Sequence, residues 1–128
     1  LNHTLETLLD PKTGCPWLIE RSADDLKHYI IEEAQEAYDA LVSKDMEHFC
    51  EELGDLLLQV ALHAKIAEKK GIFCFSDTVK SINDKLIRRN PHVFGNAEQR
   101  KKRSIPEIEE EWLRIKREEK SKMTDVNR

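Results

Sequence analysis

Apolar residues recur at helical spacing along most of the chain, and the residues that favour turns fall between these periodic segments. No segment alternates apolar and polar residues for long enough to indicate a β-strand between turn signals. The pattern therefore predicts an all-α protein. The helices that it predicts cover residues 4–9, 22–41, 45–70, 76–90 and 104–120.

The ends of these helices carry recognisable capping residues. Ser22 is followed three residues later by Asp25, a spacing typical of a capping box, and Ser76 is expected to cap the fourth helix. Gly71 is expected to end the third helix, because glycine adopts the left-handed conformation after a helix C-terminus at little cost. Pro106 fits the first turn of the last helix.

The predicted helix over 45–70 carries apolar residues on every side. One face consists of Phe49, Leu53, Leu56, Val60, Ala64 and Ala67. The other sides carry Cys50, Leu58, Ala61 and Leu62. A helix that is apolar all round needs cover all round, which a few amphipathic helices can hardly supply. We therefore expect a homodimer with this helix at its centre, and a compact monomer is the alternative.

The length and the charge of the chain limit its class. Its 128 residues suit one domain over 1–128, with a polar loop over 91–104 and a frayed tail over about 121–128. The 21 basic and 25 acidic residues leave a net charge of −4, which argues against nucleic acid as a partner. No apolar run approaches the roughly 20 residues of a membrane span, and three cysteines without CxxC spacing favour a reducing compartment. We expect a soluble, cytoplasmic protein without a membrane partner.

Two pairs of acidic residues lie on consecutive predicted helices, Glu33 with Glu36 and Glu52 with Asp55. Side chains three residues apart share a helix face, so both members of a pair can reach one ion. Glu33 falls within the apolar stripe of its helix and Glu36 lies at the edge, whereas Glu32 points away. A carboxylate in a core is costly unless it meets a positive charge, and this stripe contains no Lys or Arg. The two pairs therefore predict a metal site.

The type of ligand indicates which ion and which substrate to expect. All-carboxylate ligation favours Mg²⁺, with Mn²⁺ as a substitute, and the Glu-x-x-His motif of di-iron bundles is absent. Mg²⁺ commonly binds beside phosphates, so the acids imply a phosphorylated ligand. Lys85 and Arg89 flank the apolar stripe of their helix, and Arg88 projects outward. Together with Lys116, one turn after Trp112 on the last helix, the two flanking cations would form a phosphate clamp.

Five motifs, in the same order along nearly the whole chain, resemble those of the MazG nucleoside triphosphate pyrophosphohydrolase family. They are GCPW at 14–17, IEEAQE at 31–36, EELGDLLLQV at 51–60, KLIRRNPHVFG at 85–95, and Glu111-Trp112 with Lys116. The KLIRRNPHVFG segment is the most specific of them. One segment departs from the family, which usually continues DKEQT after CPW where this chain has LIERS at 18–22.

The resemblance implies a fold and an activity. The fold would be a helical bundle of the all-α NTP pyrophosphatase type, with a four-helix active-site bundle in an intertwined dimer. The activity would be Mg²⁺-dependent hydrolysis of NTPs or dNTPs between the α- and β-phosphates to NMP and pyrophosphate, in nucleotide-pool house-cleaning. By position, the metal ligands would be Glu33, Glu36, Glu52 and Asp55, and the nucleotide contacts would be Lys85, Arg89, Trp112 and Lys116.

The clustered charges suggest in-line attack of water on the α-phosphorus with pyrophosphate as the leaving group. Glu32 or Glu36 is the nearest candidate for the catalytic base, although metal-assisted hydrolysis does not always need one. Two alternatives share the acidic core. One is a narrower dUTP, dCTP or phosphoribosyl-ATP pyrophosphohydrolase, and the other is a non-catalytic nucleotide-binding regulator.

Overall fold

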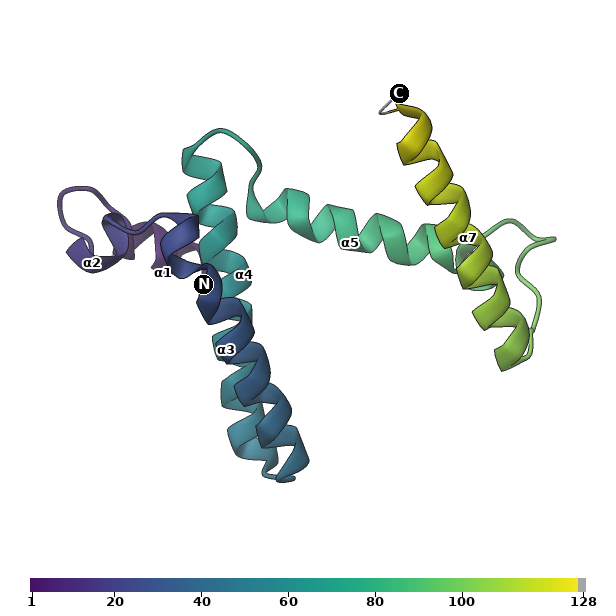
Figure 1. The fold of residues 1–128 in the computed structure, drawn as a ribbon, viewed down its shortest axis with the longest axis horizontal. Coiled ribbons are helices and arrows are strands. Elements are labelled where there is room, and N and C mark those ends of the chain that lie inside the picture. Colours follow the sequence, from purple (N-terminus) through teal and green to yellow (C-terminus); the bar gives the residue numbers. More distant parts are fainter. Residues whose placement is uncertain (127–128) are drawn as a thin grey trace. The chain divides into compact units, whose positions relative to one another are not determined.

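The computed structural model describes residues 1–126, with side chains through Met123, and all regular structure in this part is helical (Figure 1). The helices are α1 (Asn2–Leu8), α2 (Pro16–Ile19), α3 (Ala23–Val42), α4 (Met46–Lys69), α5 (Phe75–Arg89), α6 (Pro91–Phe94) and α7 (Ile105–Val126). The all-α prediction is confirmed for these residues. None of the described helices combines the length and the apolar composition that crossing a membrane requires.

The chain divides into two compact units, Leu1–Thr78 and Val79–Arg128, and the boundary between them falls within α5. We describe each unit by itself, as unit 1 and unit 2. The expectation of a single domain over 1–128 stays a prediction.

Capping boxes begin α3 and α7. The backbone N–H of Asp25 donates to the Ser22 hydroxyl at 3.2 Å, and the Ser22 N–H donates to the Asp25 carboxylate at 3.0 Å. Ser104 and Glu107 exchange the same two bonds at 3.3 and 3.2 Å. Each box satisfies backbone donors that the first turn of a helix leaves free, so both starts are fixed by local sequence.

The end of α4 also follows the prediction. Gly71 has a φ of +71°, and the N–H of Ile72 donates to the Ala67 carbonyl at 3.0 Å. This is the six-to-one bond of a Schellman motif, which glycine permits because it has no Cβ.

The predicted cap of α5, Ser76, is wrong by two residues. The helix begins at Phe75, and the N–H of Cys74 donates to the Asp77 carboxylate at 2.9 Å. Asp77 therefore acts as the acidic member of the cap, three residues after Cys74, and Ser76 lies inside the first turn.

Two short helices, α2 and α6, were not predicted. Each begins with a proline at its first position, and each spans only four residues, too few to show a helical period. Helix α6 lies in the segment 91–104, which was expected to be a loop. The tail over about 121–128 was expected to be frayed, but α7 continues to Val126. Residues 127–128 of this tail lie outside the described part of the chain.

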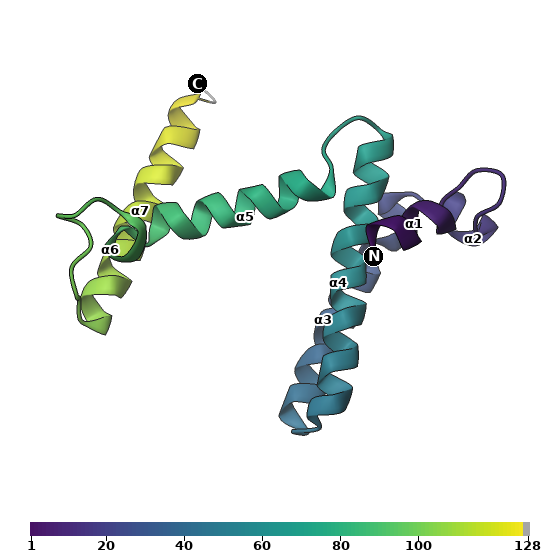
Figure 2. The same ribbon diagram turned by 180° about the vertical axis from the view of Figure 1, so that it is seen from behind.

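Unit 1 is built on α3 and α4, which run side by side in opposite directions, with α1 packed against α4 (Figures 1 and 2). The buried core of this unit consists of Leu5, Leu9, Leu26, Ala61, Leu62 and Ile66. Leu58 packs against this core, which therefore joins α1, α3 and α4.

The faces of α4 differ from the prediction. Leu62 was expected on an outer side, but it is buried because α1 covers that side of the helix. Leu53 and Val60 were expected on the inner face, but they are 45% and 42% exposed. Leu57 is 48% exposed as well. Helix α4 therefore has a covered face toward α1 and α3 and an uncovered apolar face that carries these three side chains.

In unit 2, contacts between polar side chains join the C-terminal end of α5 to α7. Arg88 and Arg89 both bind Glu119, and the Trp112 indole N–H donates to the Asn90 side-chain oxygen at 3.0 Å. Ile115 is the buried apolar residue of α7 in this unit.

Candidate active site

Helices α3 and α4 bring four carboxylates together. These side chains are Glu33, Glu36, Glu52 and Asp55, and each offers one oxygen that lies within 4.8 Å of those of the other three. The three-residue spacing puts each pair on one side of its helix, and the pairing of α3 with α4 brings the two sides together. The expectation that both acidic pairs form one group agrees with this geometry. We call these four residues the acidic cluster.

Two members of the acidic cluster contain buried oxygens without a partner. The Glu52 side chain is only 11% exposed, and its Oε2 atom accepts no hydrogen bond within the described residues. The Oε2 atom of Glu33 is likewise buried and accepts no hydrogen bond within the described residues. A buried acceptor without a partner costs free energy, and a cation is one kind of partner that could offset this cost. The acidic cluster could therefore hold a metal ion.

The electrostatics of the cluster point the same way. Burial raises the pKa of Glu33, and the neighbouring carboxylate of Glu36 raises it further. Burial also raises the pKa of Glu52, again with a contribution from Glu36, and His48 opposes this rise. Like charges this close disfavour ionisation of all members together, and a bound cation would reverse that effect.

A cavity of about 390 Å³ opens beside the acidic cluster. It is lined by Glu36, Asp39, Ala40, Ser43, His48 and Glu52. The Nε2 atom of His48 lies 3.4 Å from Glu52 Oε1, one helical turn away on α4. Sequence reasoning missed His48, although its place four residues before a predicted ligand was a usable signal.

Two further residues, Glu32 and Gly54, are sequence neighbours of members of the acidic cluster. Glu32 is exposed and is not a member, in agreement with the projection that pointed it away, and its role as a base stays a prediction. A Cβ atom at Gly54, between Glu52 and Asp55, would meet no atom within 4 Å. The backbone next to the two α4 acids is therefore open.

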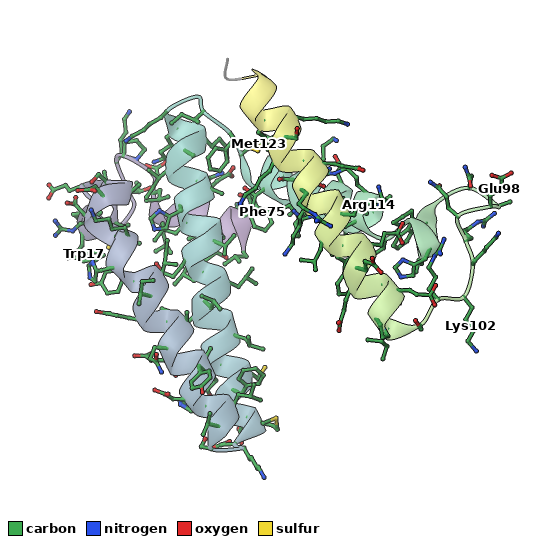
Figure 3. All side chains as sticks on the ribbon, turned by 45° about the vertical axis from the view of Figure 1, so that its right-hand side comes forward. Trp17, Phe75, Glu98, Lys102, Arg114 and Met123 are labelled. Atoms are coloured by element: carbon green, nitrogen blue, oxygen red, sulfur yellow. The ribbon has the colours of Figure 1, made fainter. Side chains whose placement is uncertain are left out.

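The residues predicted to contact the nucleotide all lie in unit 2. Arg89 and Lys116 line one cavity of about 530 Å³. The rest of its lining is Leu113, Arg117, Glu119, Lys120 and Met123, of which Figure 3 labels Met123 near the end of α7. Lys85 is half-buried on α5, and Trp112 is bound to Asn90. The structure thus brings Arg89 and Lys116 to one cavity, and the phosphate-binding role of all four stays a prediction.

Arg88 was expected to project outward as a solvated charge. Its side chain is 52% exposed, but its Nε atom donates to Glu119 Oε1 at 2.7 Å. The other oxygen of Glu119 accepts from Arg89 at 2.9 Å. No sequence pattern indicated this contact, because Glu119 lies 30 residues beyond Arg89.

Comparison with known proteins identifies relatives that match most of the chain. Residues 21–94 match the family described as MazG nucleotide pyrophosphohydrolase domain, and this segment contains the acidic cluster. The nucleoside triphosphate pyrophosphohydrolase/pyrophosphatase MazG of Thermotoga maritima is 42% identical over 118 residues, which are 92% of this chain and 43% of that protein. The nucleoside triphosphate pyrophosphohydrolase of Escherichia coli K12 is 38% identical over 117 residues, or 91% of this chain and 43% of that protein.

A solved structure resembles the fold as well. The crystal structure of a mazG-related protein from Thermotoga maritima superposes with a TM-score of 0.71 at 25% sequence identity. The match covers 91% of this chain and 99% of that chain. The chain spans less than half the length of the curated relatives named above.

Proposed function

Because the chain belongs to the MazG nucleotide pyrophosphohydrolase family, we propose that it hydrolyses nucleoside triphosphates to the monophosphate and pyrophosphate. The observation that carries this proposal is the acidic cluster, which lies inside the segment that matches the family and contains two buried oxygens without partners. A role in the nucleotide pool would place the protein in the cytoplasm.

The residues of the acidic cluster would hold Mg²⁺, or Mn²⁺ in its place. Carboxylate oxygens are the ligands that these hard cations prefer, and the cluster contains no sulfur or nitrogen ligand. When bound, Mg²⁺ supplies Lewis acidity toward the phosphoryl group and neutralises part of the triphosphate charge.

The attacking water must lose a proton during the reaction, and a side chain of the protein can accept it. Water attacks the α-phosphorus, a new P–O bond forms, the bond from that phosphorus to the α–β bridging oxygen breaks, and pyrophosphate leaves with the electron pair. Glu36 lines the cavity beside the cluster and is exposed to water, so its carboxylate is well placed to accept the proton. Glu32, exposed but outside the cavity lining, is the second candidate.

The cations of unit 2 would contact the nucleotide. Lys85 and Arg89 would neutralise the phosphates, and Trp112 and Lys116 would complete the binding residues. Support comes from the cavity that Arg89 and Lys116 share, because two cations around one hollow suit a polyanion.

We propose further that the protein is a homodimer. Leu53, Leu57 and Val60 form an exposed apolar face on α4, the longest helix among the described residues. A contiguous apolar face that is exposed on a long helix often marks an interface. A second copy on this face would build the four-helix bundle of the intertwined dimer from the α3–α4 pairs of the two protomers.

Pyrophosphate release, measured with Mg²⁺ and separately with each common NTP, each dNTP and phosphoribosyl-ATP, tests the proposed activity. Turnover of several nucleotides is expected. Turnover of dUTP, dCTP or phosphoribosyl-ATP alone would establish one of the narrower enzymes instead. Binding without any release would establish a regulator and contradict the hydrolase.

A further inference from the structure

Glu119 is the residue of unit 2 that connects two consecutive arginines. Its Oε1 atom accepts from Arg88 Nε at 2.7 Å, and its Oε2 atom accepts from an Arg89 terminal nitrogen at 2.9 Å. Consecutive residues of a helix point in different directions, about 100° apart. A carboxylate that binds both of them therefore fixes the direction of each long side chain.

The charge of Glu119 is permanent under ordinary conditions. Hydrogen bonds from Arg89 and Arg88 lower the pKa of its carboxyl to about 2. The contact is therefore independent of pH across the physiological range, so it serves as a fixed support and not as a pH switch.

The same contact faces the cavity that Arg89 shares with Lys116. Glu119 also lines this cavity, and the Arg89 side chain is only 25% exposed, with a buried Nε atom. Glu119 accepts a hydrogen bond from one of the two terminal nitrogens of Arg89, and the other terminal nitrogen does not bind Glu119. Charge-assisted bonds of this kind restrict an arginine more than neutral ones do.

We propose that Glu119 is a positioning residue, which holds the Arg89 guanidinium in the orientation that meets the nucleotide phosphates. The proposal rests on the proposed function, in which Arg89 contacts the substrate. Pre-orientation matters because a free arginine loses rotamer entropy when it binds, and Glu119 removes most of that loss beforehand. Glu119 itself does not touch the reacting atoms.

Binding of α,β-methylene-ATP, an analogue that cannot be cleaved at this bond, tests the proposal without requiring turnover. Calorimetry would compare the wild type, Glu119→Gln, Arg89→Ala and the double variant. Glu118→Gln is the matched control, because Glu118 is the preceding residue of α7 and binds Arg114 at 2.7 Å instead (Figure 3 labels Arg114). Glu119→Asp, which keeps the charge but shortens the side chain, replaces Glu119→Gln if that variant does not fold.

We expect Glu119→Gln to weaken binding by roughly tenfold and Glu118→Gln to leave it unchanged. In the Arg89→Ala background the Glu119 substitution should change affinity by less than about twofold, because its effect passes through Arg89. In turnover assays the loss should appear in KM and not in kcat.

Two results would overturn this proposal alone. An equal loss in the Arg89→Ala background would show that Glu119 supports the fold generally. Tighter binding by Glu119→Gln would show that Glu119 competes with phosphate for the arginines. The hydrolase proposal fails separately, when the wild type binds the analogue but releases no pyrophosphate from any NTP. A wild type that does not bind the analogue would sink both.

Discussion

The acidic cluster of unit 1 and the Arg88–Arg89–Glu119 group of unit 2 differ in how their charges are arranged. In the acidic cluster four carboxylates converge, burial raises the pKa of Glu33 and Glu52, and two buried oxygens have no hydrogen-bond partner among the described residues. In the arginine–glutamate group opposite charges pair, and the pKa of the Glu119 carboxyl falls to about 2. An external cation could complete the first arrangement, whereas in the second the Glu119 carboxylate is already paired with two arginines of the same chain. Under the proposed function, the first group would bind a ligand and the second would support a ligand-binding residue.

Neutralising one acid of the cluster is expected to have the largest effect. Glu33→Gln or Asp55→Asn should reduce Mg²⁺-dependent pyrophosphate release by roughly 100-fold or more, because each variant keeps the side-chain volume but loses ligand charge. Circular dichroism should show an unchanged helical content. Exposed Glu47, in the first turn of α4, offers a matched control in Glu47→Gln. Normal turnover in both cluster variants would contradict the proposal that the acidic cluster binds the catalytic metal.

The two regions should also differ in the sign of a stability change. In metal-free protein, Glu33→Gln relieves repulsion and should raise the melting temperature, whereas Glu119→Gln breaks two charge-assisted bonds and should lower it. Thermal melts in EDTA measure both. A fall of similar size in both variants would erase the distinction between the regions.

The leucines of α4 differ in a similar way, because Leu62 is buried in the core of unit 1 and Leu57 is exposed. Leu62→Glu places a charge in the core of unit 1 and should cost several kcal/mol, enough to unfold it. Leu57→Glu alters only the uncovered apolar face, so it should leave the helical spectrum intact and convert a dimer to a monomer. Light scattering with circular dichroism distinguishes the two results. A wild type that is monomeric at micromolar concentration would refute the dimer.

The two arginines should contribute unequally. Arg89→Ala should reduce kcat/KM by about ten- to a hundredfold, the effect of losing a charge-assisted phosphate contact. Arg88→Ala should reduce it by only a few fold, since Arg88 shares Glu119 with Arg89 but is half exposed. Steady-state kinetics at fixed Mg²⁺ and ionic strength would compare them, and a larger loss at Arg88 would reverse the assignment.

The smallest expected effect concerns pH. Because burial raises the folded-state pKa of Glu52 above 4.5, the folded state holds this proton more tightly than the unfolded state does. The stabilisation is therefore complete below 4.5 and is lost as pH rises through the raised pKa. In EDTA, the unfolding free energy of the wild type relative to Glu52→Gln should increase as pH falls through this window. A relative decrease would contradict the raised pKa.

Local patterns predicted the parts of the fold that local chemistry determines. The cap of α3 by Ser22 and Asp25 and the end of α4 at Gly71 depend on residues three to five positions apart, so the sequence contains them in full. The faces of the helices depend on what packs against them. Along the helix predicted over 22–41, the apolar stripe consists of Leu26, Ile30, Ala34, Ala37 and Leu41. Leu26 and Ala37 are buried, as the stripe predicted, but Ile30 and Leu41 are exposed. Periodicity shows that a stripe exists and not which neighbour covers it.

The same limit applies to the candidate site. The spacing of the two acidic pairs was sufficient to predict that four carboxylates share one place, because two regular helices fix it. The Glu119 contact could not be predicted, since it joins residues 30 positions apart, with α6 and a loop between them. Arg88 and Arg89 are the same residue type at consecutive positions, and only the structure shows that the Glu119 carboxylate binds both.

Isothermal titration of Mg²⁺ into the wild type and Glu52→Gln tests the central claim most directly, because it asks whether the acidic cluster is a metal site without depending on substrate or turnover. The account predicts saturable binding to the wild type and its loss in Glu52→Gln, with both proteins equally helical. The same binding curve for both proteins, or no binding to the wild type, would contradict it.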